Sequence, residues 1–339
     1  MAARQRVADH LNTALLAALA ADDRLYVLGQ DITDPYGGAF KVTRGLSSRF
    51  PRQVIGTPIS EAGLVGLANG LALAGNRVIV ELMFADFVTL AFDQIVNFAA
   101  KSVSMYGRRV PLPVVVRCPT GGRRGYGPTH SQSLQKHFLG VPDLDVYEIS
   151  PFHDCGDLLA GALTTGVPAL LFEDKVLYTG FRRPPGTADD LFRYDLVGSW
   201  PGTAVVRIDE PGTAPPDCVL ITPGGVAERA LTAMRELLLH HEISAELYVP
   251  ARLDPMDIEP ILPAAARAGQ VVVVEDGTPG GGWAADVAHR LHTALWGQLR
   301  GPVRVLCAAE SVVPGAAHLE REVLVQAGSI SSTIAREHR

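Results

Sequence analysis

The sequence predicts an α/β protein with two doubly wound domains, each built on a mostly parallel sheet. Short, mostly apolar runs such as LYVLG (25–29), RVIVEL (77–82) and PLPVVVR (111–117) alternate with longer amphipathic segments. Runs of this kind are typical of strands that helices bury on both faces. The alternation is interrupted once, at 181–204, by a stretch rich in Pro, Gly and charge, and then resumes. The interruption predicts a boundary between two domains.

The first domain alternates strands and helices, with glycine-rich or polar loops between some of them. Strands are predicted where β-branched and apolar residues run together, and helices where apolar residues recur with a helical period. In chain order we expect an N-terminal amphipathic helix, a strand at 25–29, a glycine-rich loop at 31–46, a strand at 53–56, a helix from about Ser60 to Ala74, a strand at 77–82, a long helix at 87–107, a strand at 111–117, a polar loop at 118–133, a strand at 144–150, a helix at 154–166 and a strand at 168–174.

A second α/β unit follows the interruption. Its expected elements are a strand beginning at 218, a helix from Val226 to Leu239, a strand at 243–250, a helix from Ile258 to Ala268, a strand in QVVVVEDG (270–277), a helix near Trp283 to Leu299 and a strand at 303–308. We therefore assign a first domain to residues 1–182, a linker to 183–204 and a second domain to 205–339.

Composition excludes several classes of protein. The 339 residues are 47% hydrophobic and carry a formal net charge of -6, which argues against a nucleic-acid partner or a polybasic membrane surface. The four cysteines are scattered without a C-x-x-C pair, so neither a disulfide framework nor a zinc site is indicated, and we expect no metal ligands. The N-terminal apolar stretch reads as an amphipathic helix, and no run approaches a membrane span. We expect a cytoplasmic protein.

One carboxylate lies in a stretch of mostly small and apolar residues. Glu61, in TPISEAGLVG (57–66), is followed by no other charge until Arg77. In one interpretation, Ser60 caps a helix and the acid complements the positive end of the helix dipole. In the other, the carboxylate binds a ligand. This stretch alone leaves both open.

The loop GGRRGYGPTHSQS (121–133) offers a second candidate site. His130 follows a flexible glycine run and could present an imidazole to a cleft as a proton donor or acceptor. Arg123 and Arg124 could bind an anion. Taken by themselves, a loop histidine and exposed arginines are more often merely solvated. The glycine-rich turns at 221–229 and 275–288 lack the spacing of a nucleotide-binding motif.

Five segments, in this order, resemble the beta subunit of the thiamine-diphosphate-dependent 2-oxoacid dehydrogenase component, a family with pyruvate, branched-chain and acetoin members. They are GQDITDPYGGAFKVTRGL, TPISEAGLVGLANGLALAG, FADFVTLAFDQIVNFAAK, THSQS and VVVVEDG. The resemblance covers almost the whole chain, and the FADF segment looks nearest to the branched-chain enzymes. It implies a transketolase-like pyrimidine-binding domain followed by a domain of the transketolase C-terminal type.

The resemblance also implies roles for individual residues. Glu61 would hydrogen-bond the aminopyrimidine ring of the cofactor and favour the tautomer that accepts a proton from the thiazolium carbon. Phe87, with Phe84 as the second choice, would pack on that ring. Gln30 would lie in the cofactor site. His130 would assist proton transfer when the acyl group passes to a lipoyl arm.

An absence predicts a partner. In the family, the diphosphate and Mg²⁺ are held by a G-D-G...N-N motif on an alpha subunit. The one Asp-Gly of this chain, Asp276-Gly277, lacks both the leading glycine and the asparagine pair. The chain is therefore expected to need an alpha subunit, in an α2β2 heterotetramer, and the resemblance also implies a lipoyl-bearing acyltransferase as a further partner.

Three departures from the family pattern stand out. Gln30 replaces a glutamate that is thought to link paired active sites, which puts such communication in doubt. Thr165-Gly166-Val167-Pro168 replaces a polar segment that holds a structural potassium ion, so we expect that ion to be absent or differently bound. Arg123 and Arg124 stand where relatives carry small residues, which suggests an acidic substrate group or altered partner docking.

The sequence is compatible with three functions. The first is decarboxylation of a 2-oxo acid with acyl transfer to a lipoyl domain. The second is a carboligase or transketolase-type reaction of a dedicated pathway, without lipoate. The third is a non-catalytic scaffold, which the joint presence of Glu61, Phe87 and His130 disfavours.

Overall fold

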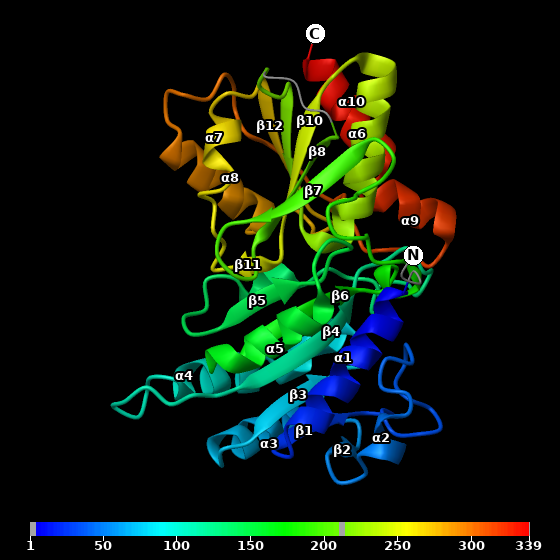
Figure 1. Cartoon of the computed structure of the whole chain (residues 1–339), viewed down its shortest axis with the longest axis vertical. Helices are drawn as coiled ribbons and strands as arrows, with labels where there is room; N and C mark the ends of the chain where they lie inside the picture. The colour runs from blue at the N-terminus through cyan, green and yellow to red at the C-terminus, as the bar shows by residue number, and fades with distance from the viewer. Residues whose placement is uncertain (1–4, 210–213, 339) are drawn as a thin grey trace. The chain divides into compact units, whose positions relative to one another are not determined.

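The computed structural model describes residues 5–209 and 214–338. Contacts divide the chain into two compact units, and each is described by itself (Figure 1). The first contains the residues up to Thr120 together with 137–149 and 154–182. The second contains 121–136, 150–153 and the chain from Arg183 onward. The loop that carries His130 thus belongs to the second unit, although its neighbours in sequence belong to the first.

The first unit is built on parallel strands in the order β5-β6-β4-β3-β1-β2. Helix α1 packs against α5, and α3 packs against β3 and η1. The elements are α1 (Val7–Ala21), β1 (Leu25–Gly29), α2 (Leu46–Arg49), β2 (Val54–Gly56), α3 (Glu61–Leu73), β3 (Arg77–Glu81), η1 (Ala85–Ala91), η2 (Gln94–Ala99), α4 (Ala100–Ser102), β4 (Val114–Thr120), η3 (Gln135–Phe138), β5 (Asp145–Glu148), α5 (Cys155–Thr165), β6 (Ala169–Asp174) and η4 (Leu177–Thr179).

The second unit contains a sheet in the order β13-β12-β9-β10-β8-β7. The first four strands are parallel to one another, β8 pairs antiparallel with β10, and β7 pairs antiparallel with β8. Helices α6 and α10 lie side by side (Figure 1). The elements are β7 (Phe192–Val197), β8 (Thr203–Ile208), β9 (Cys218–Ile221), η5 (Gly224–Val226), α6 (Ala227–His241), β10 (Ala245–Pro250), β11 (Arg252–Asp254), α7 (Leu262–Ala265), β12 (Gln270–Val274), α8 (Trp283–Ala294), β13 (Arg304–Leu306), α9 (Ala317–Val323) and α10 (Ala327–Glu337).

The predicted α/β class with two mostly parallel sheets is confirmed. The expected linker at 183–204, however, contains β7, which pairs antiparallel with β8. Phe192 and Tyr194 are buried while Arg193 and Asp195 are exposed. This alternation is typical of a strand with one solvated face, and the surrounding Pro, Gly and charge concealed it.

Two predicted helices are shorter or less regular than expected. The long helix at 87–107 is divided among η1, the wider turns of η2 and the short α4. The Asn69 side-chain amide donates to the carbonyl of Gln94 at 2.9 Å, and such insertion into the hydrogen-bond ladder distorts a helix. The helix expected at 258–268 is reduced to α7, because Pro260 and Pro263 cannot donate backbone hydrogen bonds.

Among the described helices, none is both long and apolar enough to cross a lipid bilayer.

Buried His153 predicts a pH-dependent stability of the second unit. Burial lowers the pKa of its imidazole to about 4, although the hydrogen bond to the Gly202 carbonyl opposes the shift. Below pH 6.5 the unfolded chain takes up a proton that the folded chain refuses, so stability falls as the pH drops towards 4. The loss at pH 5 is about 2 kcal/mol relative to pH 8. His153→Gln should flatten the melting temperature between pH 8 and pH 5, whereas His240→Gln, at an exposed position, should leave the slope unchanged.

Candidate functional site

Glu61 is buried at an otherwise exposed corner of the first unit. It opens α3, just beyond the end of β2, and is only 5% exposed, while Ile59 two residues earlier is 78% exposed. Ser60 occupies the N-cap position but makes no side-chain capping hydrogen bond. The carboxylate does lie in the first helical turn, where the helix dipole favours negative charge. Capping by Ser60 therefore does not explain this stretch, while the dipole contribution remains.

Gln30 lies beside that carboxylate. It follows β1 directly, and its Nε2 donates to Glu61 Oε1 at 3.2 Å. Both side chains are buried. Within the described chain, the Gln30 Oε1 atom is buried without a hydrogen-bond partner, and no second bond to the Glu61 carboxylate is seen. A buried amide and carboxylate with unused acceptor capacity are arranged to receive a donor from a ligand.

Two phenylalanines flank the start of η1. The rings of Phe84 and Phe87 meet edge to face, with centroids 6.1 Å apart. Because η1 packs against α3, this aromatic pair and Glu61 lie on adjoining elements. Phe84 also meets Phe40 edge to face at 5.6 Å, and Phe40 contacts Tyr178 at 5.1 Å. The rings of Phe40 and Tyr178 thus support the aromatic pair.

Those rings rest on a buried ion cluster that the sequence did not predict. Arg117 is fully buried and forms a two-pronged pair with Glu173, Nε to Oε1 at 2.8 Å and Nη2 to Oε2 at 2.7 Å, and it also pairs with Glu81. Tyr178 donates its hydroxyl to the same Glu173 carboxylate. Burial raises the pKa of Glu81 although Arg117 opposes it. The available signal was the charge that ends each of the apolar runs VVVR and LFED, although β4 continues to Thr120 and Arg117 lies at its middle.

The loop 121–133, which carries Arg123, Arg124 and His130, lies in the second unit. His130 Nδ1 is 2.9 Å from the Thr129 hydroxyl, and the His130 amide donates to the Gly127 carbonyl at 3.3 Å. The Arg123 guanidinium donates to the Gly225 carbonyl at 3.3 Å. The structure therefore groups Glu61, Gln30, Phe84 and Phe87 in one unit and His130, Arg123 and Arg124 in the other. The roles expected of all seven stay predictions.

The segment 165–168 is hydrogen-bonded within the first unit, where the carbonyls of Gly166 and Pro168 accept the amides of Leu112 and Asp145. The Thr165 hydroxyl donates to the Ala162 carbonyl at 2.9 Å and accepts from the Val167 amide at 3.2 Å. Within residues 5–209 and 214–338, no group of three or more His, Cys, Asp or Glu side chains is arranged to hold a metal ion.

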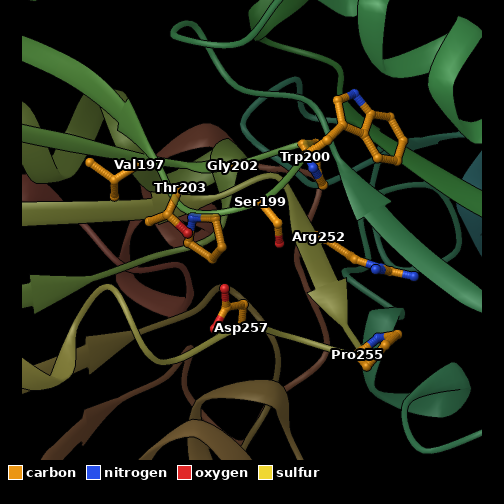
Figure 2. Close-up of a pocket in the computed structure, with 10 residues that line it drawn as sticks. Val197, Ser199, Trp200, Gly202, Thr203, Arg252, Pro255 and Asp257 are labelled. Atoms are coloured by element: carbon orange, nitrogen blue, oxygen red, sulfur yellow. The ribbon is translucent and has the colours of Figure 1, made fainter.

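A small cavity of about 40 Å³ lies in the second unit and contains none of the predicted site residues. Figure 2 shows the Ser199 hydroxyl and the Asp257 carboxylate facing each other across it, while the Trp200 ring points away. A space of this size suits a water molecule or two, not a substrate.

The ion cluster predicts a measurable dependence of stability on one hydroxyl. Tyr178→Phe removes the hydrogen bond to the buried Glu173 carboxylate and should lower the free energy of unfolding by about 1.5–3 kcal/mol, as expected for a bond to a charged group. Tyr106→Phe, at an exposed position, should change it by no more than about 0.5 kcal/mol. Urea denaturation of both variants measures the difference. Equal midpoints would show that the hydroxyl contributes nothing.

Comparison with known proteins gives a consistent answer. Residues 4–180 match the family described as transketolase, pyrimidine binding domain, and residues 206–330 match transketolase, C-terminal domain. The chain is 32% identical to the Arabidopsis thaliana mitochondrial protein named pyruvate dehydrogenase E1 component subunit beta-1, over 94% of this chain and 85% of that protein. It is 33% identical to the Drosophila melanogaster mitochondrial pyruvate dehydrogenase E1 component subunit beta, over 96% and 87% of the two chains.

A bacterial relative carries a different name. The chain is 30% identical to the Bacillus subtilis acetoin:2,6-dichlorophenolindophenol oxidoreductase subunit beta, over 94% of this chain and 92% of the relative. Among solved structures, a split-gene transketolase described as an inactive beta4 tetramer matches with a TM-score of 0.69 at 20% identity, covering 97% of this chain and 96% of that one. A transketolase variant from Pichia stipitis matches with a TM-score of 0.65 at 13% identity, covering 99% and 46%. These two likenesses show the fold.

Proposed function

Because the chain belongs to the family of transketolase-type beta subunits that includes those of the pyruvate dehydrogenase E1 component, we propose that it is the beta subunit of a thiamine-diphosphate-dependent 2-oxoacid dehydrogenase. It would help decarboxylate a 2-oxo acid and pass the acyl group to a lipoyl domain. The observation that carries the proposal is the burial of Glu61 beside Gln30, with acceptor capacity left over on both side chains.

These residues fit an aminopyrimidine ring. A ring nitrogen that carries a proton would donate to the Glu61 carboxylate, and the unpartnered Gln30 Oε1 would accept from the same ligand. Phe87 and Phe84 supply aromatic surface for the ring. When bound, thiamine diphosphate supplies a carbon nucleophile and an electron sink for the decarboxylation. Glu61 would hold a proton on the pyrimidine ring, and His130 would serve as the proton carrier during acyl transfer.

The proposed partner is an alpha subunit carrying the G-D-G...N-N motif, which would hold the diphosphate and Mg²⁺ in an α2β2 assembly. Large apolar side chains are exposed close to Glu61 in the chain, at Ile59 and at Leu67 on α3, and Leu90 is exposed on the adjoining η1. Apolar surface of this kind favours burial against another chain. The carbonyls of Gly166 and Pro168 already accept backbone amides, which favours a subunit that does not need the structural potassium ion.

A second function has one observation in its favour, since the two family models that match the chain are both described as transketolase domains. A carboligase or transketolase-type subunit of a dedicated pathway would use Glu61 in the same way but pass its acyl equivalent to a carbonyl compound. A cytoplasmic location and a lipoyl-bearing acyltransferase as partner remain part of the proposal.

The proposal is tested by purifying the chain with a candidate alpha subunit and assaying a panel of 2-oxo acids with an artificial electron acceptor. Glu61→Ala should lower kcat by at least about a hundredfold, because the proton on the pyrimidine ring loses its acceptor. Asp157→Ala, an exposed acid in the first turn of α5, is the matched control and should keep full turnover. Undiminished turnover in the Glu61 variant removes the assignment. Acyloin formation without lipoyl acylation would favour the second function.

The arginines of the loop are tested by substrate preference. The Arg123/Arg124 double alanine variant is compared with the parent, with Arg124→Ala beside it, since the Arg123 side chain also donates to the Gly225 carbonyl. If Arg124 meets an acidic substrate group, KM for dicarboxylic 2-oxo acids should rise about tenfold while that for monocarboxylic acids stays the same. Arg108→Ala, at an exposed position of the other unit, is the control. A parallel change for both substrate classes would contradict the acidic-substrate hypothesis.

A further inference from the structure

A buried carboxylate from the C-terminal part of the chain accepts hydrogen bonds from the backbone of the loop 121–133. Glu320 lies on α9 and is only 3% exposed. Its Oε1 accepts the amide of Arg123 at 2.6 Å, and its Oε2 accepts the amide of Gly125 at 3.3 Å. Hydrogen bonds from backbone amides to an ionised carboxylate are stronger than those between neutral groups. All three residues belong to the second unit, although nearly 200 positions of sequence separate α9 from the loop, as the 197-residue spacing of Arg123 and Glu320 shows.

The loop adopts a conformation that needs such support. Arg123 has a φ of 68°, in the left-handed region that a residue with a Cβ atom disfavours. Gly122 lets α9 approach closely, because a Cβ atom there would lie 2.8 Å from Glu320 Oε1 and 2.6 Å from Leu324 Cδ1. The Glu320 carboxylate thus occupies the space that the missing side chain leaves, and it bonds to an amide of the strained turn.

The far end of this contact is anchored by a buried ion pair. Just past α9, the Val325 amide donates to Asp276 at 3.2 Å, and Asp276 pairs with Arg229. Arg229 donates to the Gly225 carbonyl at 3.1 Å, and the Arg123 side chain donates to that same carbonyl. Although burial opposes it, the charge of Arg229, aided by that of Arg123, lowers the pKa of Asp276. The loop, α9 and the start of α6 therefore form a closed circuit of polar contacts.

The circuit reaches the proposed acyl-transfer histidine. The Gly121 amide donates to the Gln132 carbonyl at 3.1 Å and closes the base of the loop, with His130 between these two positions. We propose that Glu320 is a positioning residue: it fixes the loop 121–132 to the second unit and thereby sets where His130 stands. The effect on acyl transfer rests on the function proposed above. The hydrogen bonds of Glu320 to the amides of Arg123 and Gly125, which we call the clamp, do not rest on it.

The clamp also reassigns Arg123. Both its backbone amide and its guanidinium are engaged within the second unit, to Glu320 and to Gly225. Arg123 is accordingly part of the architecture of the loop.

Trypsin provides a test that needs no activity, because Arg123 and Arg124 are themselves cleavage sites. Loss of two charge-assisted hydrogen bonds in Glu320→Ala should open the loop and speed cleavage at these arginines by about tenfold or more. Glu320→Gln, which keeps one acceptor oxygen, should give a smaller increase. Glu322→Gln, an exposed acid on the same helix, is the matched control and should cleave like the parent chain. Cleavage at Arg235 and Arg290, which lie inside helices α6 and α8 of the second unit, serves as the internal reference for unfolding.

The cleavage pattern decides the clamp even if one variant folds poorly. Global unfolding accelerates the loop and the reference sites together, and the comparison then passes to Glu320→Gln. An unchanged loop rate in a Glu320 variant whose reference sites are also unchanged overturns the clamp.

The functional consequence is measured in the complex with an alpha subunit. Glu320→Gln should reduce acylation of a lipoyl domain about tenfold more than it reduces decarboxylation followed with an artificial electron acceptor, because only the former is proposed to need His130. Equal losses in both assays would overturn the positioning role. If the parent complex shows neither activity, the proposed function fails, while the trypsin result still decides the clamp.

Discussion

A charged group in the interior of a protein has to be paired, and this constraint organises the first unit. Arg117 lies in the middle of a parallel sheet with no access to solvent, so its guanidinium depends on the carboxylates of Glu173 and Glu81. Once those two carboxylates are held, Tyr178 is held by its hydroxyl and Phe40 by its ring contact with Tyr178. The phenylalanines beside the proposed pyrimidine site therefore rest on an ion cluster, and the position of their rings does not depend on apolar packing alone.

The second unit repeats the arrangement with a different ion pair. Arg229 is buried, the Asp276 side chain is only 7% exposed, and Asp276 stands two residues past the end of β12. Their remaining hydrogen bonds go to the backbone at Gly225 and Val325. Polar groups just beyond the carboxyl ends of parallel strands leave the apolar strands undisturbed, and they are free to hold loops. In each unit, buried charge immobilises the segment that carries proposed site residues.

This division has a chemical meaning if the proposed function holds. The groups assigned to cofactor activation, Glu61 and Gln30, belong to the first unit, whereas the loop assigned to acyl transfer belongs to the second. The two half-reactions would then depend on two different groups of buried charges, one in each unit, and each group can be weakened separately by substitution. Gln30 also gives Glu61 a neutral hydrogen-bond donor in place of a second acid, so the two side chains attract one another where two carboxylates would repel.

The sequence by itself determined the class of fold, the order of most strands and the identity of the residues proposed for catalysis. Apolar strand runs report burial on both faces, and short motifs such as TPISEAG and THSQS are local in sequence. The tertiary structure decided what is not local. It placed β7 inside the expected linker, distorted the helix at 87–107 through the Asn69 side chain, and joined Glu320 to a loop far back in the chain. No periodicity or spacing records these contacts, because a buried carboxylate finds its amide partners through the packing of the whole unit. The loop with His130 follows β4 in sequence, yet it is the C-terminal unit that holds it.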